Sequence, residues 1–117
     1  MNVPAVSVIL PAYNCEKFIG KAIQSVLQQT FTDFELIIVN DGSTDNTESI
    51  IYSFDDQRIV YLKNQHNQGL IYTLNKAITE ANGKYIARMD ADDICLPERI
   101  ATLFPYTTLF RSRKSVV

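Results

Sequence analysis

Four apolar, β-branched runs alternate with helical patterns, and this alternation constrains the fold more than any other feature of the chain. The runs are residues 6–10, which stop at Pro11, then 34–39, 59–62 and 85–89. Apolar residues recur at helical spacing in the intervening segments 18–27, 48–54 and 70–81. Strands that alternate with helices predict a parallel sheet covered on both faces, with right-handed crossovers. We therefore expect an α/β fold with about four parallel strands.

Capping residues predict where the helices begin and end. Asn14 is placed to cap the first helix. Asp45, followed three residues later by Glu48, matches a capping box for the second. Gly83 is expected to end the third helix in a left-handed conformation. Pro97 indicates the first turn of a fourth helix that starts at residue 96.

Polar residues follow three of the predicted strands. Tyr13 and Asn14 follow the first strand, Asp41 follows the second, and an acidic cluster at residues 90–93 follows the fourth. Ligands of open parallel sheets bind beyond the carboxyl ends of the strands. We therefore expect these groups, although distant in sequence, to meet at one rim of the sheet.

The acidic cluster is the candidate metal site. In an extended chain alternate residues share a side, so Asp90 and Asp92 are expected to point the same way and Asp93 another. Two carboxylates suit Mg²⁺ or Mn²⁺, which keep open positions for phosphate oxygens. Alone, such a pair is more typical of a solvated turn, but its place after a buried strand favours the metal site.

The other rim residues each have a structural alternative. Asp41 can accept a hydrogen bond from a nucleobase N–H, or it can form an Asx turn with Gly42. Tyr13 can stack on a base, or it can be a half-buried packing residue. His66, the only histidine, lies in a polar segment and is expected to be exposed rather than catalytic.

Charge and cysteine content exclude several classes of function. The formal net charge of −2 gives no general attraction to nucleic acid or to an anionic membrane. Cys15 and Cys95 form no CxxC pair and are expected to be reduced thiols of a cytoplasmic protein. No apolar run reaches the length of a membrane span, and the start of the chain does not match a signal peptide.

Residues 101–117 break the pattern of the first hundred. They contain no Asp or Glu but carry Arg111, Arg113 and Lys114, and they show neither helical nor strand periodicity. Their sequence is similar to translated read-through of a sequencing adapter; a divergent or frameshifted end is the alternative. We assign one domain to residues 1–100 and no function to residues 101–117.

Four ordered motifs resemble family 2 glycosyltransferases of the GT-A fold. They are the first strand with its Pro-Ala-Tyr-Asn turn, the Val-Asn-Asp-Gly-Ser-Thr-Asp end of the second strand, the Asn-Gln-Gly and Asn-Lys-Ala segments, and Arg-Met-Asp-Ala-Asp-Asp with the Leu-Pro-Glu-Arg after it. The match runs from residue 3 to residue 100. The resemblance implies a Rossmann-like nucleotide-sugar-binding domain, and four motifs in this order are far more specific than any one of them.

The resemblance also implies roles for the rim residues. The first-strand turn and the second-strand end would bind the nucleotide, which is typically uridine diphosphate. Asp90 would hold the ribose or assist the metal. Asp92 would be the main metal ligand. The nucleotide-binding residues by this assignment are Pro11, Ala12, Tyr13, Asn14, Asp41 and Asp90, and the metal ligands are Asp92 and Asp90.

The implied reaction is metal-dependent, inverting transfer of the sugar to an acceptor hydroxyl. The acceptor is expected to be a saccharide or a lipid-linked saccharide in cell-surface polysaccharide or glycolipid synthesis, with the full-length protein at the inner membrane face. The family supplies its general base from a later segment, so we expect this chain, which we interpret as truncated, to bind nucleotide and metal without turnover.

Three alternatives stay open at this point. One is a non-catalytic nucleotide-binding or folding remnant, whose core is too incomplete to be stable alone. Another is a nucleotidyltransferase, although the Pro11-Ala12-Tyr13-Asn14 turn lacks the glycine-rich, basic phosphate loop expected there. A receiver-like phosphoacceptor domain is the weakest, because the Asp-x-Asp arrangement does not suit it.

Overall fold

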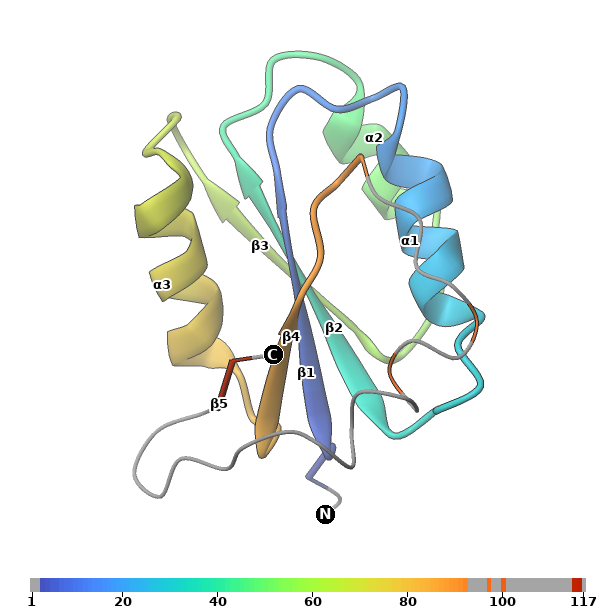
Figure 1. The fold of residues 1–117 in the computed structure, drawn as a ribbon. Coiled ribbons are helices and arrows are strands. Elements are labelled where there is room, and N and C mark those ends of the chain that lie inside the picture. The colour runs from blue at the N-terminus through green and yellow to red at the C-terminus, as the bar shows by residue number, and fades with distance from the viewer. Residues whose placement is uncertain (1–2, 93–96, 98–99, 101–114, 117) are drawn as a thin grey trace.

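A computed structural model describes residues 3–92, 97, 100, 115 and 116 of the chain (Figure 1). The predicted alternation of strands and helices is confirmed. In chain order the elements are β1 Val6–Ala12, α1 Ile19–Leu27, β2 Phe34–Asp41, α2 Thr47–Tyr52, β3 Ile59–Asn64, α3 Leu70–Glu80, β4 Tyr85–Arg88 and β5 Ser115–Val116.

The strands form one parallel sheet in the order β3-β2-β1-β4-β5. From β1 the chain steps outward through β2 to β3, and then returns to the other side of β1 with β4. Such a reversal opens a crevice at the carboxyl ends of the two strands that flank it, here β1 and β4. The short strand β5 extends the predicted set of about four strands and pairs with Tyr85 and Ile86.

Both faces of the sheet are covered, as the alternation predicted. Figure 1 shows α1 and α2 on one face and α3 on the other. Alternate residues of β1 and β2 enter the two cores, which explains why these strands are apolar almost throughout. The first core includes Val8, Leu10, Leu36, Ile38, Ile19, Ile23 and Ile51, and the second includes Ile9, Ile37, Val39, Ala77 and Ala81.

β1 does not stop at Pro11, because the proline occupies a position where no ladder bond is lost. β2 pairs with β1 as far as Ala12, but β4 pairs with it only as far as Ile9. The carbonyl of Ile9 accepts the N–H of Met89 at 2.9 Å, so Pro11, two residues further along, also faces the β4 side. Among the described residues no strand pairs with Pro11 on that side, so the missing N–H of proline breaks no ladder bond there.

Two capping predictions are wrong, because the side chains concerned bond to other partners. Asn14 does not cap α1, whose N-cap position is Phe18. Asp45 and Glu48 form no capping box: Asp45 accepts the N–H of Thr47, two residues on, at 2.9 Å. The Glu48 carboxylate instead accepts the Tyr61 hydroxyl at 2.6 Å.

The predicted role of Gly83 is also wrong. Among the described glycines only Gly42 and Gly69 have positive φ. Gly83 is required for a different reason, since a Cβ at this position would lie 2.6 Å from the backbone nitrogen of Ser7. The glycine therefore allows the chain entering β4 to pass closely beside the start of β1.

Several predictions fall on residues outside the described set. These are Asp93, Cys95, most of the predicted fourth helix, and residues 101–114. Within the part of the chain that the structure does describe, no helix combines the length and apolar character that crossing a membrane requires.

Candidate functional site

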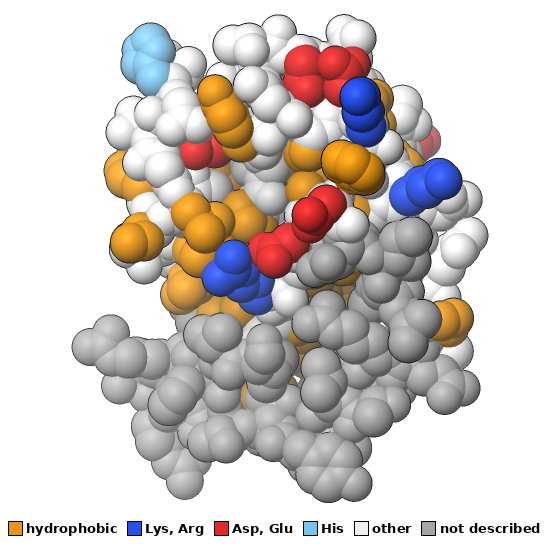
Figure 2. Space-filling view, turned by 45° about the horizontal axis from the view of Figure 1, so that its top comes forward, with side chains coloured by type: hydrophobic (Ala, Val, Ile, Leu, Met, Phe, Trp, Pro, Cys, Tyr) orange, Lys and Arg blue, Asp and Glu red, His pale blue; other side chains and the backbone are white. Residues whose placement is uncertain are grey.

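A pocket of about 580 Å³ opens at the carboxyl ends of β1, β2 and β4. Figure 2 looks onto this face and shows acidic side chains near its centre beside basic ones. Every residue that the sequence placed in the site lines this pocket: Pro11, Ala12, Tyr13, Asn14, Asp41, Asp90 and Asp92. The structure therefore brings together groups that lie up to about eighty positions apart in the chain.

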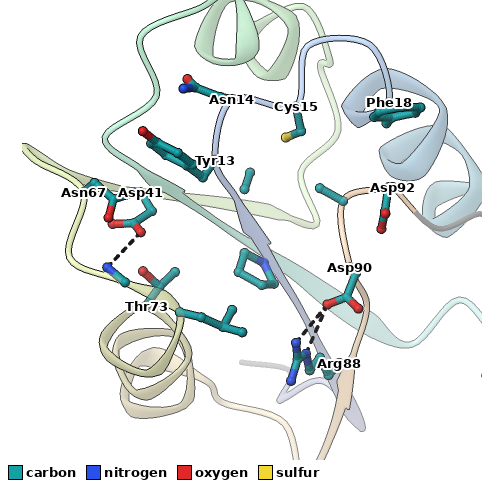
Figure 3. Close-up of a pocket in the computed structure, with 15 residues that line it drawn as sticks. Tyr13, Asn14, Cys15, Phe18, Asp41, Asn67, Thr73, Arg88, Asp90 and Asp92 are labelled. Carbon is teal, nitrogen blue, oxygen red and sulfur yellow. Dashed lines mark hydrogen bonds and ion pairs between the residues drawn. The ribbon is translucent and has the colours of Figure 1, made fainter.

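Tyr13 is the aromatic group of the pocket. It is 48% exposed, so about half of its surface is open to contact with a ligand. Figure 3 shows its ring on the same side of the pocket as Asp41. A flat aromatic face beside a carboxylate can hold a planar base by stacking while the carboxylate bonds its edge.

Asp41 is buried at the end of β2, and its carboxylate binds the segment that leads into α3. Oδ1 accepts the N–H of Gln68 at 2.7 Å and the amide of Asn64 at 2.9 Å, and Oδ2 accepts the N–H of Gly69 at 3.1 Å. The alternative of an Asx turn with Gly42 is not what the structure contains. A carboxylate has about four acceptor sites, so these three donors leave one for a ligand.

A further network holds the Asp41 carboxylate in place. Asn64, which donates to it, also donates to Thr73 at 3.2 Å and accepts the ammonium of Lys76 at 2.9 Å. The lysine contact fixes which end of the Asn64 amide faces Asp41, because an ammonium group can only donate. The orientation of the Asp41 carboxylate is thus determined from β3 and α3 together.

Asp90 and Asp92 are both exposed at the pocket. β4 ends at Arg88, and residues 91 and 92 form a turn, so the extended-chain argument for their shared side does not apply. Both nevertheless line the same pocket. Arg88 donates to Asp90 Oδ1 through two nitrogens, at 3.1 and 3.2 Å, which leaves Oδ2 as the oxygen more open to a ligand.

Asp90 and Asp92 fit a divalent cation only if the ligand supplies part of the coordination shell. No cluster of three or more His, Cys, Asp or Glu side chains that could hold a metal occurs among the described residues. Magnesium-type sites commonly use one or two carboxylates, with water and substrate phosphates completing the shell. The donor set of Asp90 and Asp92 suits that kind of site, in which the ligand brings part of the coordination.

Sequence reasoning missed several residues that line the pocket. Those not assigned to the site beforehand are Cys15, Phe18, Asn67, Gly69, Leu70, Thr73, Arg88 and Ala91. The strand-end rule could have found Arg88, the last residue of β4. Thr73, buried on α3, had no such signal, because its position depends on how α3 docks on the sheet.

Two other polar residues of this region have simple explanations. Cys15 is a free thiol, and its burial raises its pKa, so it stays protonated at neutral pH. His66 is exposed, as expected from its polar segment. The Cys15 thiol is therefore not activated as a nucleophile, and His66 does not line the pocket.

Comparisons with known proteins agree with this geometry. The sequence model of the family described as Glycosyl transferase family 2 matches residues 7–108. An uncharacterized glycosyltransferase of Haemophilus influenzae is 45% identical over 107 residues, covering 90% of this chain and 33% of that protein. The Escherichia coli protein WfgD, a UDP-Glc:alpha-D-GlcNAc-diphosphoundecaprenol beta-1,3-glucosyltransferase, is 40% identical over 95 residues, covering 81% and 38%.

Solved structures give the same result. TarS residues 1–349 of S. aureus, in complex with UDP, matches with a TM-score of 0.80 and 30% identity, over 86% of this chain and 31% of that one. The mannosyltransferase PcManGT from Pyrobaculum calidifontis, in complex with GDP-Man and Mn²⁺, matches with 0.75 and 26%, over 87% and 31%. The chain spans roughly a third of the length of these relatives.

Proposed function

The chain belongs to glycosyl transferase family 2, and on that premise we propose that its pocket binds a nucleotide-diphosphate sugar, with UDP as the nucleotide. The observation that carries the proposal is the meeting of Tyr13, Asp41, Asp90 and Asp92 around one pocket at the β1/β4 crevice. The aromatic ring and the oriented acceptor suit a nucleobase, and the two exposed carboxylates suit a cation that binds the diphosphate.

The nucleobase binds between Tyr13 and Asp41. The Tyr13 ring stacks on the base, and the remaining acceptor site of Asp41 takes a ring N–H, which uracil offers. Pro11 and Ala12 also line the pocket, and neither places a long side chain in it. The presence of UDP in the TarS complex supports this choice of base.

The diphosphate lies toward Asp90 and Asp92. We assign Asp92 as the main ligand of Mg²⁺ or Mn²⁺, and Asp90 as its partner or as a ribose contact. A bound cation there would offset the charge that builds on the departing nucleoside diphosphate. Arg88 holds Asp90 through two hydrogen bonds. The Mn²⁺ in the PcManGT complex supports the metal assignment.

The proposed reaction of the whole protein is a single inverting displacement. An acceptor hydroxyl oxygen bonds to the anomeric carbon, the bond from that carbon to the diphosphate breaks, and the hydroxyl proton passes to a general base. We propose a saccharide or lipid-linked acceptor at the inner membrane face. The name of WfgD, which includes a diphosphoundecaprenol acceptor, supports this class.

Binding of UDP tests the proposal directly. We expect calorimetry to detect UDP binding in the presence of Mn²⁺. EDTA or Asp92→Asn should weaken that binding by roughly tenfold or more, because even residues that only support metal ligands cause losses of about this size when they are replaced. UDP with Mn²⁺ should also raise the melting temperature. Asp55→Asn is the matched control, because Asp55 is an exposed aspartate between α2 and β3, outside the pocket.

The outcomes separate the proposal from its rival. UDP binding that needs both Mn²⁺ and Asp92 supports a donor-binding domain. No binding and no melting shift at saturating UDP would mean that the chain is a non-catalytic remnant of such a domain.

A further inference from the structure

We propose that residues 43–47, the polar segment after β2, position the Tyr13–Asn14 turn for nucleotide binding, and that Asn14 is a positioning residue rather than a ligand contact. This inference rests on the proposed function, because it assigns a role within the same pocket. The segment itself contributes no residue to the pocket lining.

Three successive backbone N–H groups after β1 donate to side chains of this segment. Asn14 donates to Ser43 Oγ at 2.9 Å, Cys15 to Thr47 Oγ1 at 3.0 Å, and Glu16 to Asp45 Oδ2 at 3.2 Å. The donors and acceptors are 29 to 32 positions apart in the sequence. We call this set of contacts the loop bridge.

The Asn14 side chain completes the loop bridge from the opposite direction. Its Oδ1 accepts the backbone N–H of Thr44 at 2.7 Å. Figure 3 shows the amide pointing away from the pocket, while the Tyr13 ring lies on the pocket side. The Asn14 amide therefore faces the segment after β2, and its oxygen is already bound within the protein.

The acceptors of the loop bridge are themselves held in place. Asp45 Oδ1 accepts both the hydroxyl of Thr47 at 2.6 Å and its N–H at 2.9 Å. Thr47 is fully buried, and its hydroxyl donates to Asp45 while it accepts the N–H of Cys15. The bridge is thus fixed at its base by a buried residue at the start of α2.

The backbone of Asn14 needs such support. Its φ is +46°, and it is the only described residue other than glycine with positive φ. Asparagine tolerates this region better than most residues, but strained backbone persists only where its surroundings determine it. Here the turn reverses the chain directly after Tyr13, so the same bonds that hold Asn14 also set the direction of the Tyr13 ring.

The alternative is that the loop bridge stabilises the fold without affecting the ligand. The two roles differ in what they predict for Tyr13. If the bridge acts by placing the ring, its removal weakens UDP binding only while the ring is present. If it is merely structural, its removal lowers the melting temperature and leaves the affinity of the folded protein unchanged.

The experiment measures UDP affinity by calorimetry with Mn²⁺, below the melting temperature of every variant. We expect Asn14→Ala to weaken binding about fivefold to tenfold, the size of one aromatic contact. Asn14→Asp, which keeps the acceptor oxygen, should stay within about twofold of the wild type. Asn82→Ala, an exposed asparagine after α3 and outside the pocket, is the matched control.

A double-mutant cycle completes the test. Ser43→Ala should weaken binding in the wild-type background but not in Tyr13→Ala, because no ring is left to position. Equal losses in both backgrounds, or an Asn14→Ala variant that binds as the wild type does, would overturn the inference. Failure of the wild type itself to bind UDP would instead refute the proposed function.

Discussion

The two ends of β2 each present a carboxylate to one end of α3, and they differ in what lies beyond. At the amino end, Glu35 accepts the N–H of Asn82, just after the helix, at 2.7 Å. At the carboxyl end, Asp41 accepts the N–H of Gly69, just before the helix, at 3.1 Å. Both carboxylates are buried. The strand therefore holds the helix at both of its ends.

A glycine allows close backbone approach at each end. At the amino end it is Gly83, which passes beside Ser7. At the carboxyl end it is Gly42, where a Cβ would lie 2.5 Å from the backbone of His66. Only Gly42 also has positive φ, at +70°.

The two ends of β2 differ in whether the pocket adjoins them. Both donors to Glu35, the Ser7 hydroxyl and the Asn82 N–H, bond to one oxygen, and Glu35 does not line the pocket. Asp41 uses both oxygens and borders the pocket. A buried, hydrogen-bonded carboxylate is thus no sign of function by itself. A buried carboxylate beside a cavity, with exposed acidic groups across from it, is a much stronger one.

Alanine at each glycine gives the largest expected effect. Gly42→Ala combines a clash with a left-handed backbone and should lower the free energy of unfolding by about 3 kcal/mol or more. Gly83→Ala meets only the clash and should cost about 1–3 kcal/mol. Urea denaturation measures both. Equal costs, or a larger one at Gly83, would contradict the difference in backbone conformation between the two ends.

Matched amide substitutions test the carboxylates themselves. Both oxygens of Asp41 accept hydrogen bonds, so Asp41→Asn would place an NH₂ group against one of the donors. We expect the substitution to lower the free energy of unfolding by about 1–3 kcal/mol. It should also weaken UDP binding. Glu35→Gln can keep its accepting oxygen and should cost less than about 1 kcal/mol, with UDP affinity unchanged. A larger loss of stability for Glu35→Gln than for Asp41→Asn would contradict this difference between the two carboxylates.

Lys76→Met tests the lysine contact that supports Asp41 through Asn64 at the carboxyl end of β2. The substitution keeps the aliphatic stem and removes the ammonium contacts with Asn64 and the Lys63 carbonyl. We expect a loss of about 1 kcal/mol in stability and a smaller loss of UDP affinity. Lys84→Met, at an exposed lysine just before β4, is the control. Unchanged stability would mean that Asn64 orients Asp41 without help.

The smallest effect concerns Glu48, a carboxylate that supports neither end of α3. Hydrogen bonds from Tyr61 and Lys63 hold the pKa of Glu48 below its ordinary value. Its contribution is therefore present above the unfolded-state pKa and is lost as the pH falls through the lower, folded-state pKa. Glu48→Gln should make stability slightly less sensitive to acid. Denaturation at neutral pH and near pH 4 would measure the change, and identical acid sensitivity would contradict it.

The sequence predicted the strands, the faces of the helices and the rim, because these depend on local patterns and one topological rule. Val8 and Ile9 indicate a buried strand from their neighbours alone. The partners of polar side chains were not predictable in this way. Asn14 bonds to Thr44 across 30 positions, and Glu35 to Asn82 across 47. No local pattern specifies such contacts, so the sequence predicts only local caps at Asn14 and Gly83.

The boundary at residue 100 and the ligand roles of the rim residues stay predictions. For the rim residues, the structure shows where the side chains lie, while the roles depend on a ligand. Binding measurements with Asp92→Asn and the Asn14 variants address those roles one residue at a time.

The divergence of β4 from β1 beyond Ile9 has a consequence for solubility. An unpaired strand edge can recruit the strand of another molecule, and a pocket that needs such an edge exposes the protein to self-association. At Pro11 the edge has no N–H to offer an incoming strand, and the ring blocks its approach. The residue that lines the pocket wall thus also keeps that edge from becoming a template for aggregation.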